Sequence, residues 1–451
     1  MKTTNRVRTV HIVGGGLAGV EASWQCLRRG LRVVLHEMRP VQMTEAHKTS
    51  NLAELVCSNS FKSLVKGSAA AELKYEMESL DSLVIKAAKL ASVPAGNALA
   101  VDRVKFSKTV EGELARFDTF ARVSEEVRSL PTAEELETSG DVWILATGPL
   151  TSKSLAAFLD GLTASEKRLF FYDAIAPTIE ADSLDMDVCF VKDRYGEVGK
   201  GDYINIPLTK EEYVRFIDDV KASEKVPLHD FEDTSYFESC LPIEVMIERG
   251  DDTLRFGPMK PVGLEDKNGK RPWAAVQLRA ENLSKTMYSM VGFQTKMKWG
   301  EQKRIFNSLP GLQNAEFLRM GSIHRNTYIH GPRMLNQNLS LKGYERVFVA
   351  GQLTGVEGYT ESAAIGLLAG RNAAALVEAK DAKLPPPGCM IGALADYVTN
   401  PESSRNYAPM NANLGLLPPV QRRKGMSKAD KKMAQIKRAQ DEFHSFHHVR
   451  C

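Results

Sequence analysis

A glycine-rich turn between an apolar strand and a helix is the feature that most constrains this chain. The segment "TVHIVGGGLAGVEASWQCLRRGLRVVLHE" spans residues 9–37, and its Gly14, Gly16 and Gly19 have the spacing G-x-G-x-x-G. In a dinucleotide-binding unit the first glycine makes the tight turn, the second admits a pyrophosphate and the third lets the helix pack on the strand. Because a helix N-terminus also favours phosphate, the turn predicts a dinucleotide site.

The residues around the turn extend this prediction to a whole unit. Thr9–Val13 reads as a buried strand, a helix runs to about Arg29, and Val33–Leu35 predicts a second strand. Glu37 follows that strand about 20 residues after the turn, where an acid hydrogen-bonds a ribose hydroxyl. The order of elements predicts an α/β fold of the Rossmann type. The alternative is a structural glycine turn.

Two later segments favour FAD over NAD. "DVWILATGPL" at 141–150 predicts a strand that ends in Ala-Thr-Gly, and residues 346–375 predict a strand, a glycine-rich turn and a long Ala/Gly-rich helix. We expect the small residues of that helix to pack under a planar cofactor. Strand, glycine turn and helix at both ends of the chain resemble the two-part FAD domain of glutathione-reductase-like flavoproteins. The alternative near the C-terminus is a plain α/β packing unit.

Composition excludes several classes of protein. Hydrophobic residues make up 43% and charged residues 25% of the 451 residues, which is ordinary for a soluble globular protein, and a net charge of +3 predicts no partner. The apolar stretches are too short for a membrane span, so we expect no membrane association and a cytoplasmic location. The six cysteines form no C-x-x-C pair, which argues against a zinc ribbon or a disulfide scaffold. We predict no metal site.

The chain divides into four predicted segments. Residues 1–160 form the N-terminal part of the FAD-binding domain, and residues 161–330 form an inserted α+β domain that faces the substrate. Residues 331–395 complete the FAD-binding domain, and residues 396–451 form a C-terminal extension with a basic tail. The tail is interpreted either as a solvated helix or as an arm that contacts phosphates.

Two segments of the inserted domain combine basic and aromatic residues. Residues 284–304 interleave lysines with aromatic side chains, and "HRNTYIH" at 324–330 forms a second basic cluster. Basic side chains position phosphates and aromatic rings stack on bases. The alternatives are a surface segment with core aromatics and a turn with a capping Asn. The candidates for substrate contact are Lys296, Lys298, Trp299, His324 and Arg325.

Cys57 and Cys240 stand among small and polar residues beside apolar runs, in "ELVCSNSFKS" and "YFESCLPIEVMIERG". Lys62 lies near the first in sequence and Arg249 near the second. Nearby cations lower the pKa of a thiol, and only the thiolate is nucleophilic. The alternative for each is a buried structural thiol, and the residues alone leave both open.

Many blocks along almost the whole chain together resemble one known family. They include "AELVCSNSFKS", "VPAGNALAVDR", "CLPIEVM", "FGPMKPVGLED", "VGFQTKMKWGEQKR", "HRNTYI" and "AGQLTGVEGYTESAAIGLLAG". In these blocks the chain is similar to the folate- and FAD-dependent tRNA (uracil-5-)methyltransferases, the TrmFO family. The C-terminal flavin block also resembles the FAD-binding tRNA wobble-uridine modification proteins, but the cysteine blocks do not.

This resemblance implies formation of 5-methyluridine at uracil-54 in the T-loop of tRNA. The carbon would come from methylenetetrahydrofolate, reduced FAD would supply electrons, and NADPH or NADH would reduce the flavin. A thiolate that adds to uracil carbon 6 makes carbon 5 nucleophilic, and a base then removes the carbon 5 proton. The family pattern assigns these roles to Cys57 and Cys240. We expect Cys240 to be the nucleophile and Cys57 the base or its partner, and the reverse division is the alternative.

The resemblance also implies a set of cofactor contacts. Tyr359 would stack on the flavin or on the folate pterin, or else it is a packing tyrosine. The residues expected at the adenosine half of FAD are Gly14, Gly15, Gly16, Leu17, Ala18, Gly19, Glu37 and Arg39. Those expected along the rest of the cofactor are Gly148, Gly351, Gln352, Leu353, Thr354 and Tyr359.

Three alternative functions stay open at this stage. The same chemistry could act on a ribosomal RNA uridine. A flavin oxidoreductase acting on a small molecule would bind no RNA and would need neither cysteine. A non-catalytic RNA-binding flavoprotein would keep the basic segments and tolerate loss of both thiols.

Overall fold

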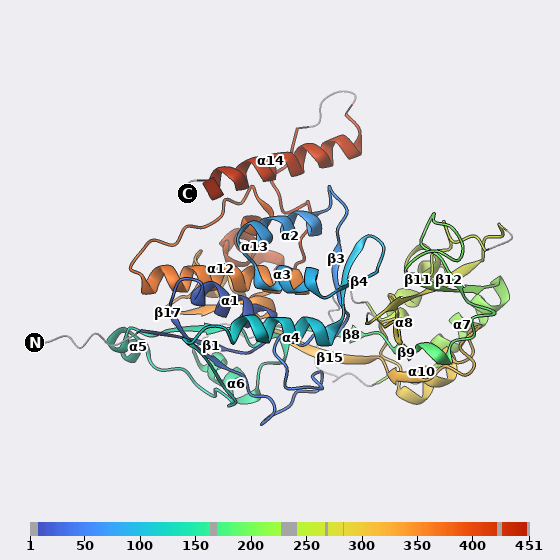
Figure 1. Ribbon diagram of the computed structural model, residues 1–451, viewed down its shortest axis with the longest axis horizontal. Coiled ribbons are helices and arrows are strands. Elements are labelled where there is room, and N and C mark those ends of the chain that lie inside the picture. Colours follow the sequence, from blue (N-terminus) through green and yellow to red (C-terminus); the bar gives the residue numbers. More distant parts are fainter. Residues whose placement is uncertain are drawn as a thin grey trace, which may run out of the picture.

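Two units stand side by side, a larger one built from both ends of the chain and a smaller one built from its middle (Figure 1). Two antiparallel strands, β8 (Leu169–Ile175) and β15 (Ser322–Tyr328), run between them. The computed structural model describes residues 8–162, 169–226, 241–266, 269–282, 284–421 and 426–448. The predicted domain boundaries remain a prediction.

A six-stranded sheet forms the centre of the larger unit, in the order β16-β17-β7-β1-β2-β6. Its strands are β1 (Thr9–Val13), β2 (Arg32–His36), β6 (Phe120–Val123), β7 (Val142–Leu145), β16 (Ser340–Leu341) and β17 (Tyr344–Val349). All neighbouring pairs are parallel except β16 with β17. The strands predicted at residues 9–13 and 33–35 are therefore confirmed, as is an α/β fold of the Rossmann type. Parallel order places the carboxyl ends of β1, β2 and β7 at one edge.

The helix after the glycine turn, α1 (Leu17–Leu27), packs against α12 (Tyr359–Val377) from the far end of the chain. A Cβ added to Gly366 would lie 2.3 Å from the Ala18 carbonyl oxygen, and one added to Gly370 would lie 2.7 Å from that of Ala22. The two backbones therefore touch. Gly366 and Gly370 therefore pack against α1, and the expected packing of this helix under a planar cofactor stays a prediction.

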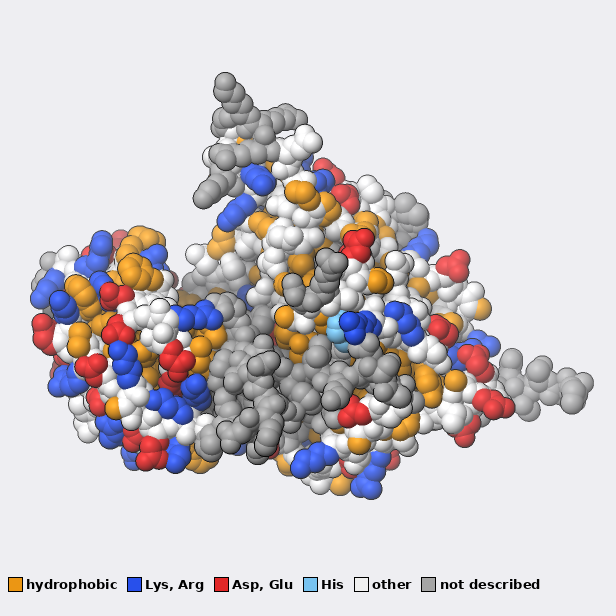
Figure 2. Space-filling model, turned by 180° about the vertical axis from the view of Figure 1, so that it is seen from behind, with side chains coloured by type: hydrophobic (Ala, Val, Ile, Leu, Met, Phe, Trp, Pro, Cys, Tyr) orange, Lys and Arg blue, Asp and Glu red, His pale blue; other side chains and the backbone are white. Residues whose placement is uncertain are grey.

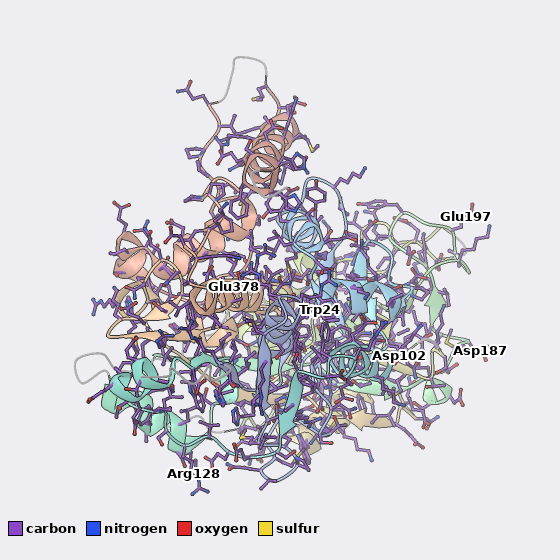
Figure 3. All side chains as sticks on the ribbon, turned by 60° about the vertical axis from the view of Figure 1, so that its left-hand side comes forward. Trp24, Asp102, Arg128, Asp187, Glu197 and Glu378 are labelled. Atoms are coloured by element: carbon purple, nitrogen blue, oxygen red, sulfur yellow. The ribbon has the colours of Figure 1, made fainter. Side chains whose placement is uncertain are left out.

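Further helices surround this pair. Trp24 of α1 lies deep among the side chains of the larger unit (Figure 3) and donates from its indole nitrogen to the Asp81 carbonyl oxygen at 2.8 Å. Buried Glu21 accepts the amide of Val84 at 2.9 Å and so caps α3. The helices are α2 (Ala69–Ser79), α3 (Leu83–Leu90), α4 (Arg103–Leu114), α5 (Ala133–Ser139), α6 (Lys153–Leu162), α11 (Gly331–Met334) and α13 (Met390–Thr399). A small antiparallel sheet joins β3 (Ser60–Ser63), β5 (Ala98–Val101) and β4 (Ser92–Val93).

The smaller unit has its own sheet and its own core. The strands of this sheet are antiparallel, in the order β10-β11-β12-β13-β9-β14. Figure 3 labels Asp187 and Glu197 at the outer edge of the smaller unit. The strands are β9 (Thr178–Glu180), β10 (Phe190–Val191), β11 (Tyr203–Leu208), β12 (Ala274–Ala280), β13 (Met287–Met290) and β14 (Phe317–Arg319). The helices are α7 (Lys210–Ala222), α8 (Ile243–Glu248), α9 (Thr253–Phe256) and α10 (Trp299–Phe306). On the face that Figure 2 shows, basic and acidic side chains are interspersed over this unit.

The basic tail contains a helix, α14 (Lys428–His448), that packs on α2. His444 shares a 2.6 Å hydrogen bond with the Tyr75 hydroxyl, and Phe443 is fully buried. One face of the tail helix is thus part of the larger unit rather than solvated. Across the described ranges, no helix is both long and apolar enough to cross a membrane.

The contact between α1 and α12 predicts a large effect of one methyl group. Gly366→Ala should lower the free energy of unfolding by about 1–3 kcal/mol, because the new Cβ must push Ala18 and α1 away. Denaturant unfolding of the purified variant measures this change. The matched control is Gly112→Ala in the exposed part of α4, where a Cβ would meet no atom within 4 Å. That control should gain about 0.5–1 kcal/mol, and a similar gain for Gly366→Ala would contradict the proposed contact.

Candidate functional site

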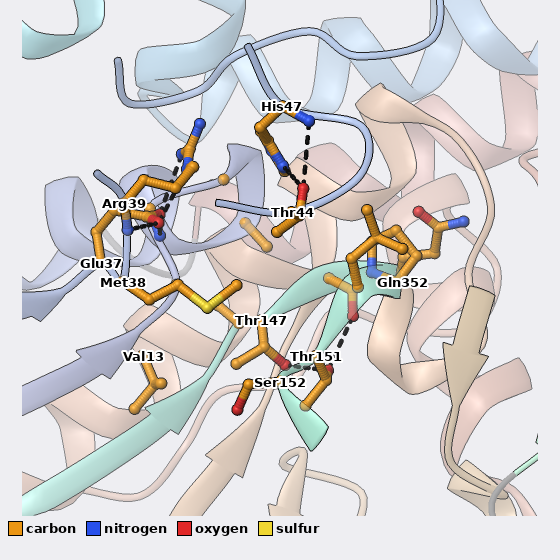
Figure 4. Close-up of a pocket in the computed structure, with 18 of the residues that line it drawn as sticks. Val13, Glu37, Met38, Arg39, Thr44, His47, Thr147, Thr151, Ser152 and Gln352 are labelled. Carbon is orange, nitrogen blue, oxygen red and sulfur yellow. Dashed lines mark hydrogen bonds and ion pairs between the residues drawn. The ribbon is translucent and has the colours of Figure 1, made fainter. Parts of the chain in front are cut away.

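A cavity opens at the carboxyl ends of β1 and β7, where ligands bind in folds of this type. It encloses about 1020 Å³, part of it open to solvent. Figure 4 shows Val13, Thr147 and Gln352 around it, contributed by three separate parts of the chain. The predicted cofactor residues that line it are Gly14, Gly15, Gly16, Leu17, Ala18, Glu37, Arg39, Gly148, Gln352 and Tyr359. Gly19, Gly351, Leu353 and Thr354 are not among the lining residues, and the last two are fully buried.

The glycine turn is shaped by contacts that leave one position open. Gly14 has a φ of +103°, and a Cβ there would lie 2.5 Å from the Ala146 carbonyl oxygen. A Cβ on Gly19 would lie 1.9 Å from the Gly14 carbonyl oxygen. At Gly16, by contrast, a Cβ would meet nothing within 4 Å. Gly14 and Gly19 are therefore required by the fold itself, whereas Gly16 leaves the backbone accessible from the cavity.

Glu37 and Arg39 form a buried charged pair at the wall of the cavity. One Glu37 oxygen accepts the Gly15 amide at 2.8 Å, and the other accepts Arg39 Nε at 2.9 Å. Arg39 also donates to Glu54 at 3.0 Å. Burial raises the pKa of Glu37, but its hydrogen bonds and charge attraction to Arg39 lower that pKa below its ordinary value. Glu37 is thus ionised, and four hydrogen bonds from Gly15 and Arg39 occupy its two oxygens, while Arg39 mainly neutralises the two carboxylates.

Cys57 lies directly beside this cavity, held by a residue from the other end of the chain. The Tyr359 hydroxyl accepts the amide of Cys57 at 2.7 Å and that of Ser58 at 3.1 Å. Tyr359 is the first residue of α12, and both it and Val56 line the cavity. Burial, followed by the interaction with Cys57, raises the pKa of Tyr359, so this ring remains a neutral phenol. The predicted cofactor tyrosine and the predicted reactive cysteine therefore meet.

The cations that the structure places near Cys57 do not include Lys62, the lysine that the sequence suggested. Lys62 Nζ is 2.7 Å from buried Glu361, so that lysine is committed to an ion pair. The guanidinium groups that interact electrostatically with Cys57 belong to Arg103 and Arg319. Sequence reasoning missed both, because they come from α4 and β14 and no local pattern joins them to the cysteine.

The remaining described cysteines are packing residues. Cys26, Cys189 and Cys389 are buried, whereas Cys57 is partly exposed. Burial raises the pKa of Cys26 and of Cys189 to about 12. Within the residues that the structure describes, no group of three or more His, Cys, Asp or Glu side chains is placed to hold a metal ion.

The structure does not describe all of the predicted site residues. Cys240 lies outside the described residues, as do the side chains of His324 and Arg325. Residues 322–328 form β15, so the interpretation of this segment as a turn is wrong.

The aromatic and basic residues of 284–304 divide between core and surface. Trp299 begins α10 and is 67% exposed, while Phe293 is fully buried. Lys298 Nζ is 2.7 Å from Glu224, and Lys296 Nζ is 3.9 Å from Glu248. Phe293 thus fits the alternative of a surface segment with core aromatics. An RNA contact of Lys296, Lys298 or Trp299 stays a prediction.

Similarity to known proteins agrees with the fold and with the family that the sequence resembles. The family model described as "Glucose inhibited division protein A" matches residues 9–381. A protein of Geobacter sulfurreducens is 51% identical over 413 residues, which cover 91% of this chain and 93% of that protein. A protein of Syntrophus aciditrophicus is 48% identical over 445 residues, covering 97% and 99%. Both are named methylenetetrahydrofolate--tRNA-(uracil-5-)-methyltransferase TrmFO.

Solved structures show the same fold at much lower sequence identity. Aquifex aeolicus GidA in its form II crystal has a TM-score of 0.69 at 16% identity, and the match covers 98% of this chain and 74% of that one. The form I crystal gives a TM-score of 0.67 at 17% identity. The GidA structures thus support the fold, and the TrmFO relatives share about half of their residues with this chain over nearly its whole length. The chain belongs to the TrmFO family.

Proposed function

We propose that this chain is an FAD-dependent methyltransferase that transfers the one-carbon unit of methylenetetrahydrofolate to carbon 5 of a uracil in tRNA. The observation that carries the proposal is the position of Cys57. This partly exposed cysteine donates its backbone amide to the Tyr359 hydroxyl beside a dinucleotide cavity. A plain flavin oxidoreductase has no need of such a thiol. The names of the relatives that share about half of its residues supply the substrate and the donor.

The residues of the cavity fit FAD. Gly16 leaves room for a pyrophosphate to approach the backbone, and no side chain caps the N-terminus of α1. Glu37 lines the cavity as an ionised carboxylate at the end of β2, where an acid meets the ribose in folds of this type, and a ribose hydroxyl would replace one of its contacts with Arg39. Gln352 and Tyr359 line the part of the cavity contributed by the C-terminal segment. When FAD is bound and reduced, it supplies the electrons that convert the transferred carbon to a methyl group.

Two thiols suit the chemistry at the uracil. Carbon 5 becomes nucleophilic only after a thiolate adds to carbon 6, and a base must then take the carbon 5 proton before the thiolate leaves. We assign the addition to Cys240 and the proton removal to Cys57. Arg103 and Arg319 add positive charge where anionic groups take part. We further assign the reaction to uracil-54 of the T-loop, with NADPH or NADH as the reductant.

The substrate assignment predicts a labelled product. Purified protein, NADPH and labelled methylenetetrahydrofolate should place label in a tRNA that lacks 5-methyluridine, and nuclease mapping should locate it at position 54. The control is the same tRNA with cytosine at that position, which should stay unlabelled. Absence of label from both tRNAs would contradict the proposed function, and label at another uridine would contradict only the assigned position.

The cysteine roles predict two different defects. With RNA that carries 5-fluorouridine, Cys240→Ala should form no covalent adduct, because carbon 6 is no longer attacked. Cys57→Ala should still form the adduct but should turn over normal tRNA about 10²- to 10⁴-fold more slowly, as expected for loss of a base. Denaturing gels and single-turnover assays measure the two effects. The opposite pattern would reverse the assignment.

The cavity assignment predicts separate effects of two glycines. Gly16→Val should sharply lower the flavin that co-purifies with the protein and leave the unfolding of the cofactor-free protein almost unchanged, since its side chain enters only the cavity. Gly19→Ala should destabilise even the cofactor-free protein, because its Cβ meets the Gly14 carbonyl oxygen. Visible absorbance and denaturant unfolding measure both quantities. Full flavin content in Gly16→Val would place the cofactor elsewhere.

A further inference from the structure

The peptide groups around Cys57 are held by an arginine of the smaller unit. Arg319, the last residue of β14, donates through Nη1 to the Val56 carbonyl oxygen at 2.8 Å and through Nη2 to the Cys57 carbonyl oxygen at 3.1 Å. One planar guanidinium thus bridges two successive carbonyls. Its fork of fixed N–H directions allows this, whereas the ammonium of a lysine is a single point of charge.

The same segment is also held from the larger unit, where Arg103 Nη2 donates to the Cys57 carbonyl oxygen at the longer distance of 3.5 Å. Arg103, the first residue of α4, donates to the carbonyl oxygen of Leu55 and forms a 2.6 Å ion pair with Glu281. The amide of Cys57 is bound by Tyr359. Both backbone polar groups of Cys57 are therefore fixed by side chains that lie far from it in the sequence.

The contact made by Arg319 belongs to a wider junction between the two units. The Asn59 side chain donates to the carbonyl oxygen of Ala280, at the end of β12, at 3.0 Å. Arg279 Nε donates in turn to the side-chain oxygen of Asn59 at 3.1 Å. Segment 55–59 is thus attached to the smaller unit at more than one point, so the position of Cys57 depends on how the two units dock.

Arg319 differs from Arg103 in forming no direct ion pair with a described carboxylate, although the charge of Glu281 also acts on it. Its Nε is buried and forms no hydrogen bond. Burial, and then the charge of Arg103, lowers the pKa of Arg319. An arginine that served only to hold the two units together would gain by pairing with an acid, because an unpaired buried charge is costly. Retention of this charge next to a thiol points to a role in the reaction.

We propose that Arg319 is a positioning residue that holds Cys57 in its reactive placement from the smaller unit and supplies a positive charge beside it. This inference rests on the proposed function. It adds that the reactive thiol is set jointly by both units, through a guanidinium that bridges the carbonyls of Val56 and Cys57. Loss of that bridge lets the peptide after Val56 rotate, and displacement of a reacting group by about 1 Å costs roughly 10²-fold in rate.

Arg319→Lys separates geometry from charge. The lysine keeps the positive charge but cannot bridge the two carbonyls, so kcat for tRNA methylation should fall about 10- to 100-fold. The KM values for tRNA and methylenetetrahydrofolate should stay within about threefold, because ground-state binding is unaffected. All rates are expressed per mole of bound FAD, so that partial loss of folded protein does not affect the result. A kcat within about twofold of the unmodified protein overturns the proposal.

Arg319→Gln removes the charge as well, and alkylation of Cys57 measures its effect. Iodoacetamide labelling at a series of pH values, followed by mass spectrometry of the peptide that contains Cys57, gives the rate for this thiol alone. The pH profile should stay in place in Arg319→Lys and should move to higher pH in Arg319→Gln, since a nearby cation favours the thiolate. Identical alkylation profiles in all three proteins would overturn the charge role.

The control and the alkylation assay make the outcomes distinguishable. Arg271→Lys changes an exposed arginine of the same unit that already pairs with Glu265, and it should change neither kcat nor alkylation. If the unmodified protein transfers no label to tRNA, the proposed function fails, but alkylation still tests Arg319. If it does transfer label and Arg319→Lys matches it in kcat, only the present inference fails.

Discussion

The direct backbone contact between α1 and α12 is the interaction on which the rest of this structure depends. Gly366 and Gly370 allow the two helices to touch at Ala18 and Ala22, with no side chain between them. The contact joins the two ends of the chain, which are separated by the whole smaller unit. It also places the N-terminus of α12 beside the glycine turn, so that one cavity receives residues from both ends.

From that contact the position of Cys57 follows in two steps. Tyr359 begins α12, and its hydroxyl accepts the amides of Cys57 and Ser58, which places Cys57 next to Val56 and Tyr359 in the wall of the cavity. Arg319 then reaches the same peptide groups from the smaller unit. The candidate cofactor site of the larger unit is thereby linked to the antiparallel sheet of the smaller unit.

The parts of the site that depend on residues close together in the sequence were predicted from the sequence pattern. Strand β1, the glycine turn and α1 were expected at the residues where they occur, because their periodicity and glycine spacing are short-range properties. Contacts between residues that are distant in the sequence could not be predicted in this way. Lys62 was the nearest cation to Cys57 in sequence, yet it pairs with Glu361, while the arginines beside the thiol come from α4 and β14. The small residues of α12 were correctly predicted to lie on a helix, but the packing of Gly366 and Gly370 against α1 was not predicted.

The sequence by itself determined that the chain contains a dinucleotide-binding unit and, through its family resemblance, which two cysteines to consider. Those conclusions rest on spacing within a turn and on matched blocks, which are properties of the chain as written. Only the tertiary structure decided that Tyr359 and Arg319 meet at Cys57 and that Gly16, unlike Gly19, is open to the cavity. Hydrogen bonds and close backbone approaches depend on position in space, and residues hundreds of positions apart carry no local signal that they will be neighbours.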